Sequence, residues 1–393
     1  MIRKHIDDCV HCGFCLPTCP TYVLWREEMD SPRGRIQLME ARLDGTIALD
    51  RTVVEHFDRC LGCMACVSSC PSGVAYDVLI GATRNTVEQE FSREAGDRVL
   101  RSLLFAALPH PRRLRVALAL APLGRVVPLP RRFRPLVEIA PPWRSREGPP
   151  AFTPAAGEPR GRVALLTGCV QSVVFGDVNA ATARVLAADG WEVAVPQQRC
   201  CGALSAHAGR TAEAERLTEQ LRHDFAGFDA IAVNASGCGS HLKDHGLPAY
   251  DVSELLAERP RARRHPLATR IAYQDSCHLR HAQALPAAYR TPLSRIPALD
   301  VVEPAEQDVC CGSAGIYNLV QPAAARELGE RKARYVLATG AQGLASANPG
   351  CLVQLATALR RAHRPLPALH PVELVDASIR NTGTARLLTH ARR

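Results

Sequence analysis

Cys9-Val-His-Cys-Gly-Phe-Cys-Leu-Pro-Thr-Cys-Pro20 has its four cysteines in the spacing C-x2-C-x2-C-x3-C-P, and residues 60–71 repeat this spacing. In bacterial ferredoxins with this pattern, three thiolates of one motif bind one [4Fe–4S] cluster and the fourth binds the other cluster. The repeated spacing therefore predicts two clusters with crossed ligation, which transfer single electrons. The predicted ligands are Cys9, Cys12, Cys15 and Cys70 for the first cluster and Cys60, Cys63, Cys66 and Cys19 for the second.

Structural zinc is the main alternative for cysteines that lie this close together. Zinc sites usually pair two cysteines, a long loop and two more ligands. Two complete four-cysteine spacings do not fit that pattern and favour iron–sulfur clusters. The segment between the motifs, residues 21–59, is longer than a minimal ferredoxin needs, so we expect it to form helices that bury the clusters.

The composition is typical of a folded protein. The chain has 393 residues, a length that is enough for two or three domains, and 47% of the residues are hydrophobic. Residues 1–8 do not resemble a secretory signal, and no apolar run reaches the roughly 18–20 residues that span a bilayer. Sixteen cysteines spaced for metal in a chain of this size indicate reduced thiols and a cytoplasmic protein.

Cysteine positions and proline density divide the chain into four predicted parts. Residues 96–160 contain no cysteine and are rich in Arg, Pro and Leu, and prolines at this density break helices into short pieces. The predicted division is a two-cluster domain at 1–95, a basic helical linker at 96–160, and α/β repeats at 161–265 and 266–393.

The second half of the chain carries an internal repeat of about 110 residues. Each copy contains a single cysteine, a Cys-Cys-Gly triplet and a further cysteine, which indicates two similar subdomains related by a pseudo-twofold axis. The two sets are Cys169, Cys200, Cys201 and Cys238, and Cys277, Cys310, Cys311 and Cys351.

Both copies alternate short apolar runs with helical segments, which predicts a parallel α/β layer. The cysteines follow the strands, where α/β folds place their sites. The fold class is thus a helical two-cluster domain of α+β type followed by tandem α/β repeats. The expected strands are 162–169, 191–196, 230–234, 271–273 and 343–347, and the expected helices are 178–189, 211–225 and 323–338.

The four thiols of each repeat allow more than one chemistry. They can hold one further iron–sulfur or metal centre per repeat, share one between the repeats, or act as redox-active thiols. In a degenerate copy they would be merely buried small apolar residues. His207 and His278 lie near these cysteines and could ligate or tune a cluster, although a surface or helix-capping role is the simpler expectation for each.

The middle segment is basic and accounts for much of the formal net charge of +9. Residues 100–127 mix Leu, Val and Phe with arginines, a pattern that can lie on an anionic membrane surface. The favoured interpretation is a helical connector whose leucines pack on the protein and whose arginines face water. No nucleic-acid motif accompanies the charge, so no nucleic-acid partner is expected.

Several longer motifs make the chain similar to a known family. It resembles the CCG-domain iron–sulfur proteins, in the branch of the glycolate oxidase iron–sulfur subunits. Lactate-utilisation proteins, anaerobic glycerol-3-phosphate dehydrogenase subunits and the heterodisulfide reductase B subunit belong to the same wider family. The motifs are residues 9–22, 30–36, 58–74, 200–204, 310–317, 348–351 and 370–374.

The resemblance implies an iron–sulfur subunit of a flavin-dependent 2-hydroxy-acid dehydrogenase complex. Partner FAD subunits would oxidise the acid, and this chain would pass electrons toward membrane quinone at the inner face of the cytoplasmic membrane. No glycine-rich dinucleotide fingerprint and no acid/base pair is evident, so neither flavin nor a catalytic residue is expected here. Each repeat departs from the heterodisulfide reductase pattern because Ala235 and Asn348 stand where a fifth cysteine would be.

Overall fold

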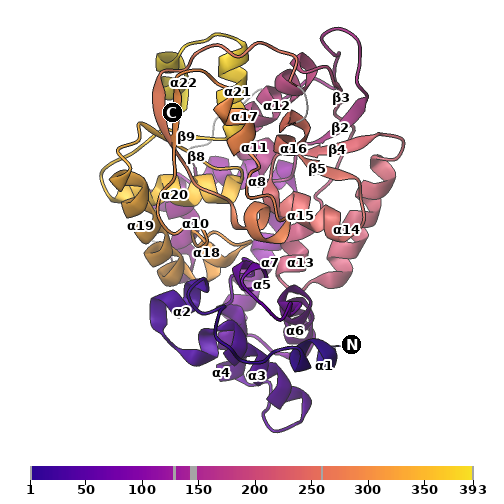
Figure 1. Cartoon of the computed structure of the whole chain (residues 1–393). Helices are drawn as coiled ribbons and strands as arrows, with labels where there is room; N and C mark the ends of the chain where they lie inside the picture. The colour runs from indigo at the N-terminus through magenta and orange to yellow at the C-terminus, as the bar shows by residue number, and fades with distance from the viewer. Residues whose placement is uncertain (1, 127–129, 142–147, 258–259, 392–393) are drawn as a thin grey trace.

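The computed structural model describes residues 2–126, 130–141, 148–257 and 260–391 (Figure 1). A helical N-terminal part lies beneath two small sheets and their helices. All sixteen cysteines are free thiols. Among the helices of the described ranges, none has the length and apolar character needed to cross a membrane.

The N-terminal part is helical, and its helices begin where the sequence provides initiating residues. Pro20 and Pro32 occupy first-turn positions, where the missing N–H of proline costs nothing. Asp50 caps another helix by accepting from the backbone N–H of Val53. The elements are α1 (Ile2–Asp7), α2 (Pro20–Trp25), η1 (Glu28–Asp30), α3 (Pro32–Leu43), α4 (Arg51–Asp58), α5 (Ala65–Ser68) and α6 (Tyr76–Glu90).

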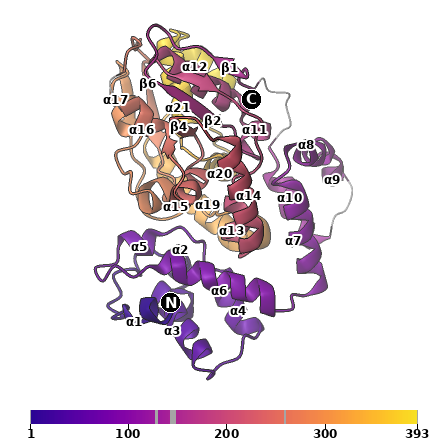
Figure 2. The same cartoon turned by 90° about the vertical axis from the view of Figure 1, so that its right-hand side faces the viewer.

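The middle segment forms short helices that run along the side of the molecule (Figure 2). Pro111 begins the second of them and Pro122 separates the second from the third, as the proline density predicts. Leu100 and Leu104 are buried against the rest of the protein. The elements are α7 (Ala95–Ala107), α8 (Pro111–Leu120), α9 (Leu123–Val126), η2 (Arg131–Phe133) and α10 (Arg134–Ile139).

The first repeat is built on a sheet of order β1-β3-β2-β4-β5, in which only β1 is antiparallel. Its strands are β1 (Phe152–Thr153), β2 (Arg162–Leu166), β3 (Glu192–Ala194), β4 (Ala230–Val233) and β5 (Ala249–Asp251). Its helices are α11 (Gln171–Val174), α12 (Gly176–Ala188), α13 (Ala203–His207), α14 (Thr211–Asp224), α15 (Ser236–Asp244) and α16 (Val252–Ala257).

The second repeat has an all-parallel sheet of order β7-β6-β8-β9, the same winding as β3-β2-β4-β5. Its strands are β6 (Thr269–Tyr273), β7 (Leu299–Val302), β8 (Gly343–Ala345) and β9 (Ala368–Leu369). Its helices are η3 (His278–Ala282), α17 (Arg290–Ser294), α18 (Tyr317–Val320), α19 (Pro322–Ala338), α20 (Pro349–Arg361), α21 (Pro371–Ile379) and α22 (Thr384–Ala391).

The prediction of duplicated parallel α/β units is therefore confirmed, with two differences in detail. Strand β1 comes from the segment expected to be linker, and it adds an antiparallel edge to the first sheet. Strands β5, β7 and β9 were not predicted, because β5 and β7 each contain an aspartate and β9 has only two residues.

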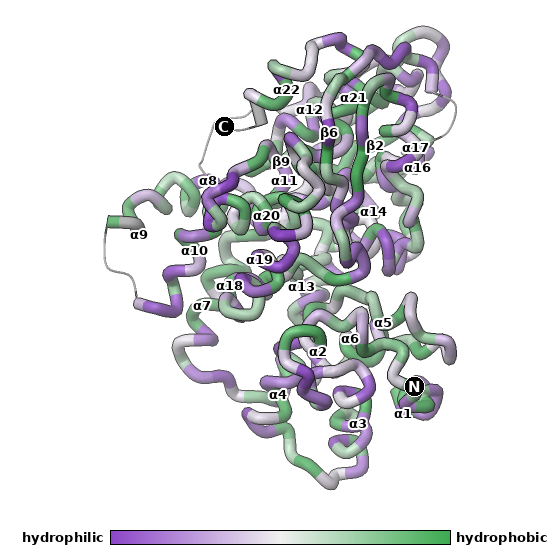
Figure 3. Tube along the Cα trace, turned by 60° about the vertical axis from the view of Figure 1, so that its left-hand side comes forward, coloured by the Kyte–Doolittle hydropathy of each residue, from purple (hydrophilic) through white to green (hydrophobic). Residues whose placement is uncertain are grey.

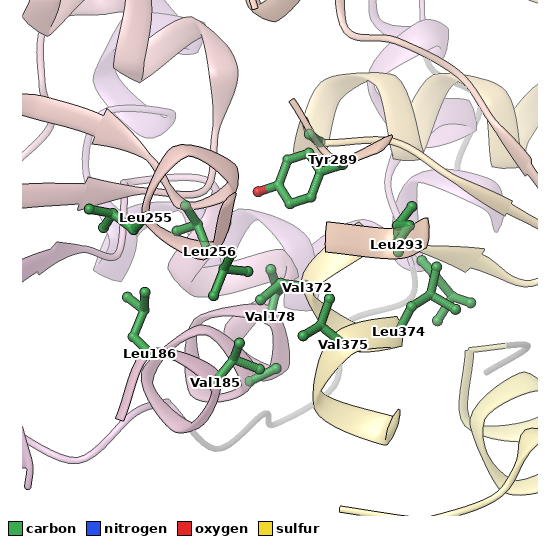
Figure 4. Packing of buried hydrophobic residues seen from close by; sticks show 14 of the residues in the cluster. Val178, Val185, Leu186, Leu255, Leu256, Tyr289, Leu293, Val372, Leu374 and Val375 are labelled. Carbon is green, nitrogen blue, oxygen red and sulfur yellow. The ribbon is translucent and has the colours of Figure 1, made fainter. Parts of the chain in front are cut away.

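One hydrophobic core joins the two repeats (Figure 4). Val185 and Leu186 on α12 pack in the same cluster as Val372 and Val375 on α21, with Tyr289 fully buried among them. Since neither repeat covers this face by itself, the two fold against each other and hold their cysteine sites in fixed relative positions.

Candidate functional site

The first four predicted ligands line one pocket in the N-terminal part. Cys9, Cys12, Cys15 and Cys70 border an open space of about 290 Å³. Cys12 is exposed and the other three are half-buried. Burial raises the pKa of the Cys15 thiol to about 11. Four convergent thiols around one pocket are a donor set that suits a [4Fe–4S] cluster.

The other four predicted ligands line a second pocket, and these cysteines are more buried than those of the first. Cys19, Cys60, Cys63 and Cys66 border a space of about 310 Å³. The first three are buried. Cys19 comes from the first motif and Cys70 from the second, so the structure brings the cysteines together in the crossed arrangement that the ferredoxin spacing predicts.

A buried arginine distinguishes the second pocket from the first. Arg35 of α3 lines the pocket and has only 1% of its side chain exposed. It donates to the hydroxyl of Thr21 at 3.2 Å, and that hydroxyl lies 3.3 Å from the sulfur of Cys19. Burial disfavours the thiolate of Cys60, but Arg35 and Arg84 outweigh this effect and lower the pKa of that thiol.

Asp30 keeps this buried cation in place. Its carboxylate accepts from Arg35 at 3.4 Å and from Arg59 at 2.9 Å, and it lies 3.0 Å from the ring nitrogen Nδ1 of His56. The motif Asp30-Ser-Pro-Arg-Gly-Arg-Ile36 thus supports the second pocket from behind. In the sequence this motif stands out only by its resemblance to the family, because nothing local reveals which arginine is buried.

The eight remaining cysteines gather at the carboxyl ends of the parallel strands, as predicted. In the first repeat, Cys169 follows β2, Cys200 and Cys201 follow β3, and Cys238 lies in the first turn of α15 after β4. The second repeat matches it, with Cys277 after β6, Cys310 and Cys311 after β7, and Cys351 in the first turn of α20.

The thiols of each repeat are linked by hydrogen bonds in the same order. Cys200 accepts from Cys169 and Cys201, and these bonds lower its pKa well below that of a free thiol. Cys310 has the same relation to Cys277 and Cys311, with the sulfurs of Cys277 and Cys310 3.9 Å apart. In both repeats these interactions lower the pKa of the first cysteine of the triplet and raise the pKa of the second.

The glycine of each triplet is required by its surroundings. Gly202 has φ +95° and a Cβ there would lie 2.7 Å from the carbonyl oxygen of Ala214. Gly312 has φ +91° and a Cβ there would lie 2.8 Å from the carbonyl oxygen of Ala325. The left-handed turn brings the cysteine pair against α14 or α19 in the two repeats.

The second pocket lies directly against the second repeat. Cys63 and Cys310 belong to one buried cluster, with Cys277 packed against it. The first repeat's Cys169 and Cys200 belong to a different cluster, with Leu217. The two sets of thiols are thus alike internally but differ in their position relative to the N-terminal pockets.

The two histidines noted in the sequence lie at the boundary between the N-terminal part and the repeats. His207 of α13 donates from Nε2 to the carbonyl oxygen of Leu61 at 2.8 Å, and burial lowers its pKa to about 3. The Nδ1 of His278 lies 3.5 Å from the sulfur of Cys277. Both are partly buried, so the expectation of surface or capping histidines was wrong.

Lys332 of α19 is a further buried charge that sequence reasoning missed. It is fully buried and donates to the backbone carbonyl of Glu306. Burial lowers its pKa to about 8, against the opposing effect of Cys311 and Cys310 nearby. A lysine in an amphipathic helix carries no local signal of burial, so only packing reveals it.

Asn348, one of the two positions without the fifth cysteine, has a structural role. Its side chain caps α20 by accepting from the backbone N–H of Gly350 at 2.9 Å, and donates to the hydroxyl of Ser236 at 2.8 Å. It therefore links the two repeats.

Within the described ranges, no three His, Cys, Asp or Glu side chains are close enough to hold a single metal ion.

Two known families match parts of this chain. Residues 5–74 match the family described as a 4Fe-4S dicluster domain. Residues 163–243 and 271–356 each match the family described as a cysteine-rich domain, CCG. The fold and the cysteine sites thus define an iron–sulfur protein with an N-terminal dicluster domain and tandem CCG domains.

Similar proteins narrow the class. The chain is 35% identical to the "Probable glycolate oxidase iron-sulfur subunit" of Bacillus subtilis, over 92% of this chain and 90% of that one. It is also 35% identical to the "Glycolate oxidase iron-sulfur subunit" of Escherichia coli, over 94% and 93%. Lactate utilization protein A of Oceanobacillus iheyensis is 26% identical over 55% of this chain and 96% of its own length. The chain belongs to the family of glycolate oxidase iron–sulfur subunits.

Proposed function

We propose that this protein is the iron–sulfur electron-transfer subunit of a flavin-dependent 2-hydroxy-acid (glycolate) dehydrogenase complex. In this role it relays electrons from a partner FAD subunit toward membrane quinone, as a cytoplasmic protein peripheral on the inner face of the membrane. The observation that carries the proposal is the convergence of eight thiols, four to each of two pockets, beside a third set in the second repeat.

The two pockets suit the two ligand sets of the proposal. Cys9, Cys12, Cys15 and Cys70 would hold one [4Fe–4S] cluster, and Cys60, Cys63, Cys66 and Cys19 the other. Such clusters, when bound, accept and release single electrons. The chain supports the second set by donating to the Cys60 sulfur from the backbone N–H of Gly62 at 3.4 Å and from the hydroxyl of Tyr76 at 3.8 Å.

The positions of the pockets suggest a direction for the relay. The first pocket is open and has exposed apolar side chains at its rim, Val10 at 68% and Phe14 at 67%. A partner flavoprotein would dock there. The second pocket is lined by more buried cysteines, and one of them, Cys63, lies in the same buried cluster as Cys310. Electrons that enter at the first pocket would therefore leave toward the second repeat, where Cys277, Cys310, Cys311 and Cys351 offer a further centre.

The proposed division of the chain follows from the positions of the cysteine sets. The proposed units are the dicluster domain at 1–95, a linker at 96–160, and CCG repeats at 161–265 and 266–393. Oxidation of the hydroxy acid is assigned to the partner subunits, with the flavin bound there and no catalytic residue on this chain.

Iron content and partner identity test the proposal together. Protein purified without oxygen from its native source should contain about eight iron atoms in the dicluster domain and should co-purify with a flavoprotein that oxidises glycolate or a related acid. Adding that acid should reduce the clusters. Iron near zero under these conditions would contradict the proposal.

Paired variants test the crossed ligation. Cys12→Ser and Cys70→Ser should perturb the same electron paramagnetic resonance signal of the reduced protein, and Cys19→Ser should perturb the other, together with Cys63→Ser. Each variant should lose up to about four iron atoms. If Cys70→Ser and Cys63→Ser affect one signal, the assignment of these ligands is wrong.

A thiol–disulfide redox enzyme is the alternative that the ionisable Cys200 and Cys310 suggest. Their burial argues against it, since only 1% and 4% of these residues is exposed and a disulfide substrate must reach the sulfur. The same relay could also serve a lactate or glycerol-3-phosphate dehydrogenase complex. Identification of the co-purifying flavoprotein distinguishes these substrates.

A further inference from the structure

The outer face of α8 and α9 carries a row of exposed apolar side chains. Val116, Leu120, Leu123 and Val126 are 60%, 54%, 61% and 85% exposed. Val116 and Leu120 are four residues apart and so lie on one side of α8, and Leu123 and Val126 are three residues apart on α9. Figure 3 shows α9 at the outer edge of the molecule.

The opposite face of α8 is already used for packing. Leu114 and Leu118 are buried in a cluster with Val173 and Val174 of α11. At 100° per residue, Leu114 and Leu118 lie about 160° around the helix axis from Val116. The outer apolar row is therefore additional to the face that anchors the helix, and burial of the helix on the protein does not explain it.

Arginines border this apolar row on both sides. Arg112 and Arg113 are exposed and precede Val116 by one turn, about 40° and 60° to either side of it. Residues 98–137 contain nine arginines and neither Asp nor Glu. Arg112 and Arg115 have no acidic partner among the residues that the structure describes.

We propose that this face of α8 and α9 is the surface by which the protein binds an anionic lipid membrane. Apolar side chains at the centre would enter the boundary between headgroups and acyl chains, while the flanking arginines extend to lipid phosphates. A uniformly cationic segment without carboxylates is complementary to a uniformly anionic surface. The inference rests on the proposed function, which requires delivery of electrons at a membrane.

The anchoring of α8 gives this surface a consequence for the relay. Because Leu114 and Leu118 fix α8 to α11, the membrane would lie beside the repeats. The first pocket belongs to the separate N-terminal part, below the repeats in Figure 1. The partner flavoprotein and the membrane would then occupy different faces of the protein.

Vesicle sedimentation of the full-length protein with its clusters tests the proposal. We expect binding to vesicles that contain phosphatidylglycerol and about tenfold or more weaker binding to pure phosphatidylcholine. The triple variant Val116→Ser, Leu120→Ser, Leu123→Ser should weaken binding to anionic vesicles by at least about tenfold. The double variant Arg112→Gln, Arg113→Gln should weaken binding to anionic vesicles about fivefold per arginine, and the binding should depend less on salt concentration.

Matched controls separate this surface from general exposure. Leu43→Ser and Val78→Ser remove apolar side chains that are 50% and 41% exposed in the N-terminal part, and they should leave vesicle binding unchanged. Cluster absorbance verifies that each variant is folded. Absence of binding to anionic vesicles would overturn the proposal. The proposal would also be overturned if the triple variant bound anionic vesicles as well as the wild type but lost a co-purifying partner. That result would show that the face is a protein interface.

Failure of this inference is distinguishable from failure of the proposed function. Vesicle binding is measured without electron transfer, and reduction of the clusters by the flavoprotein is measured without vesicles. Reducible clusters without vesicle binding would reject the membrane surface alone. Vesicle binding without reducible clusters would reject the relay alone.

Discussion

Replacing Arg35 should change the reduction potential of one cluster and not of the other. Arg35 is a fully buried cation at the second pocket, whereas the first pocket is open to solvent. A positive charge stabilises the reduced, more negative form of a nearby cluster and so raises its potential. Arg35→Gln removes this charge while retaining side-chain donors for Thr21.

The structure sets the magnitude. Arg35 donates to the hydroxyl of Thr21 at 3.2 Å, and that oxygen lies 3.3 Å from the Cys19 sulfur, so the cation is within about 6.5 Å of that ligand. At an effective dielectric constant of about 20, one charge at this distance contributes about 2.5 kcal/mol. Since about 1.4 kcal/mol corresponds to 59 mV for one electron, the potential should fall by about 100 mV.

A redox titration followed by electron paramagnetic resonance measures both potentials in one sample. Arg35→Lys keeps the charge and should stay close to the wild-type potential. Arg42→Gln, in the last turn of the same helix and paired with Glu90, should leave both potentials unchanged. After loss of Arg35, Asp30 retains its ion pair with Arg59 at 2.9 Å, so its charge is not left without a partner.

The reasoning would be refuted by an Arg35→Gln variant that keeps its full iron content with both potentials within about 20 mV of wild type, a twofold change in the equilibrium constant. An equal fall in Arg35→Lys would also refute it, because the effect would then follow from packing and not from charge.

Three further substitutions test the repeats. Gly202→Ala combines a left-handed φ with a Cβ 2.7 Å from a carbonyl oxygen, and should lower the free energy of unfolding by at least about 2 kcal/mol in chemical denaturation. Gly227→Ala, with φ +83° and open space around it, should cost only about 1 kcal/mol; equal losses would contradict the steric argument. Asn348→Ala removes the cap of α20 and the bond to Ser236, and its melting temperature should reflect a loss of about 1–2 kcal/mol; an unchanged melting temperature would show that neither bond stabilises the fold. Burial lowers the pKa of His370 from 6.5 to about 3, so the unfolded chain binds the proton first and stability falls as the pH drops below 6.5. Between pH 7.5 and 5.5 this residue should cost about 1.4 kcal/mol. His370→Asn, which can still cap α21, should remove that part of the pH dependence, and an unaltered pH dependence in the variant would contradict the assignment.

The duplicated, parallel α/β architecture was predictable because its signals are local. Two kinds of local signal can be recognised along the chain. Short apolar runs indicate strands, as at 162–166 and 230–233, and a helical period indicates a helix at 211–224. Strands β7 and β9 carry no such signal, since β7 contains Asp300 and β9 has only two residues, and both depend on pairing with β6 and β8. Their place is fixed by neighbours that are distant in sequence.

The sequence by itself determined which residues could bind metal, because ligand spacing in a ferredoxin motif is a local property of the chain. The sequence also shows that a glycine follows each cysteine pair, but it does not show which backbone carbonyl excludes a side chain at that position. Only the tertiary structure decided that Cys63 lies in one buried cluster with Cys310, that Arg35 is the buried cation, and that α8 keeps a second apolar face outside. Each of these depends on packing between segments far apart in the chain, and burial of a charge or an apolar side chain is settled by what covers it.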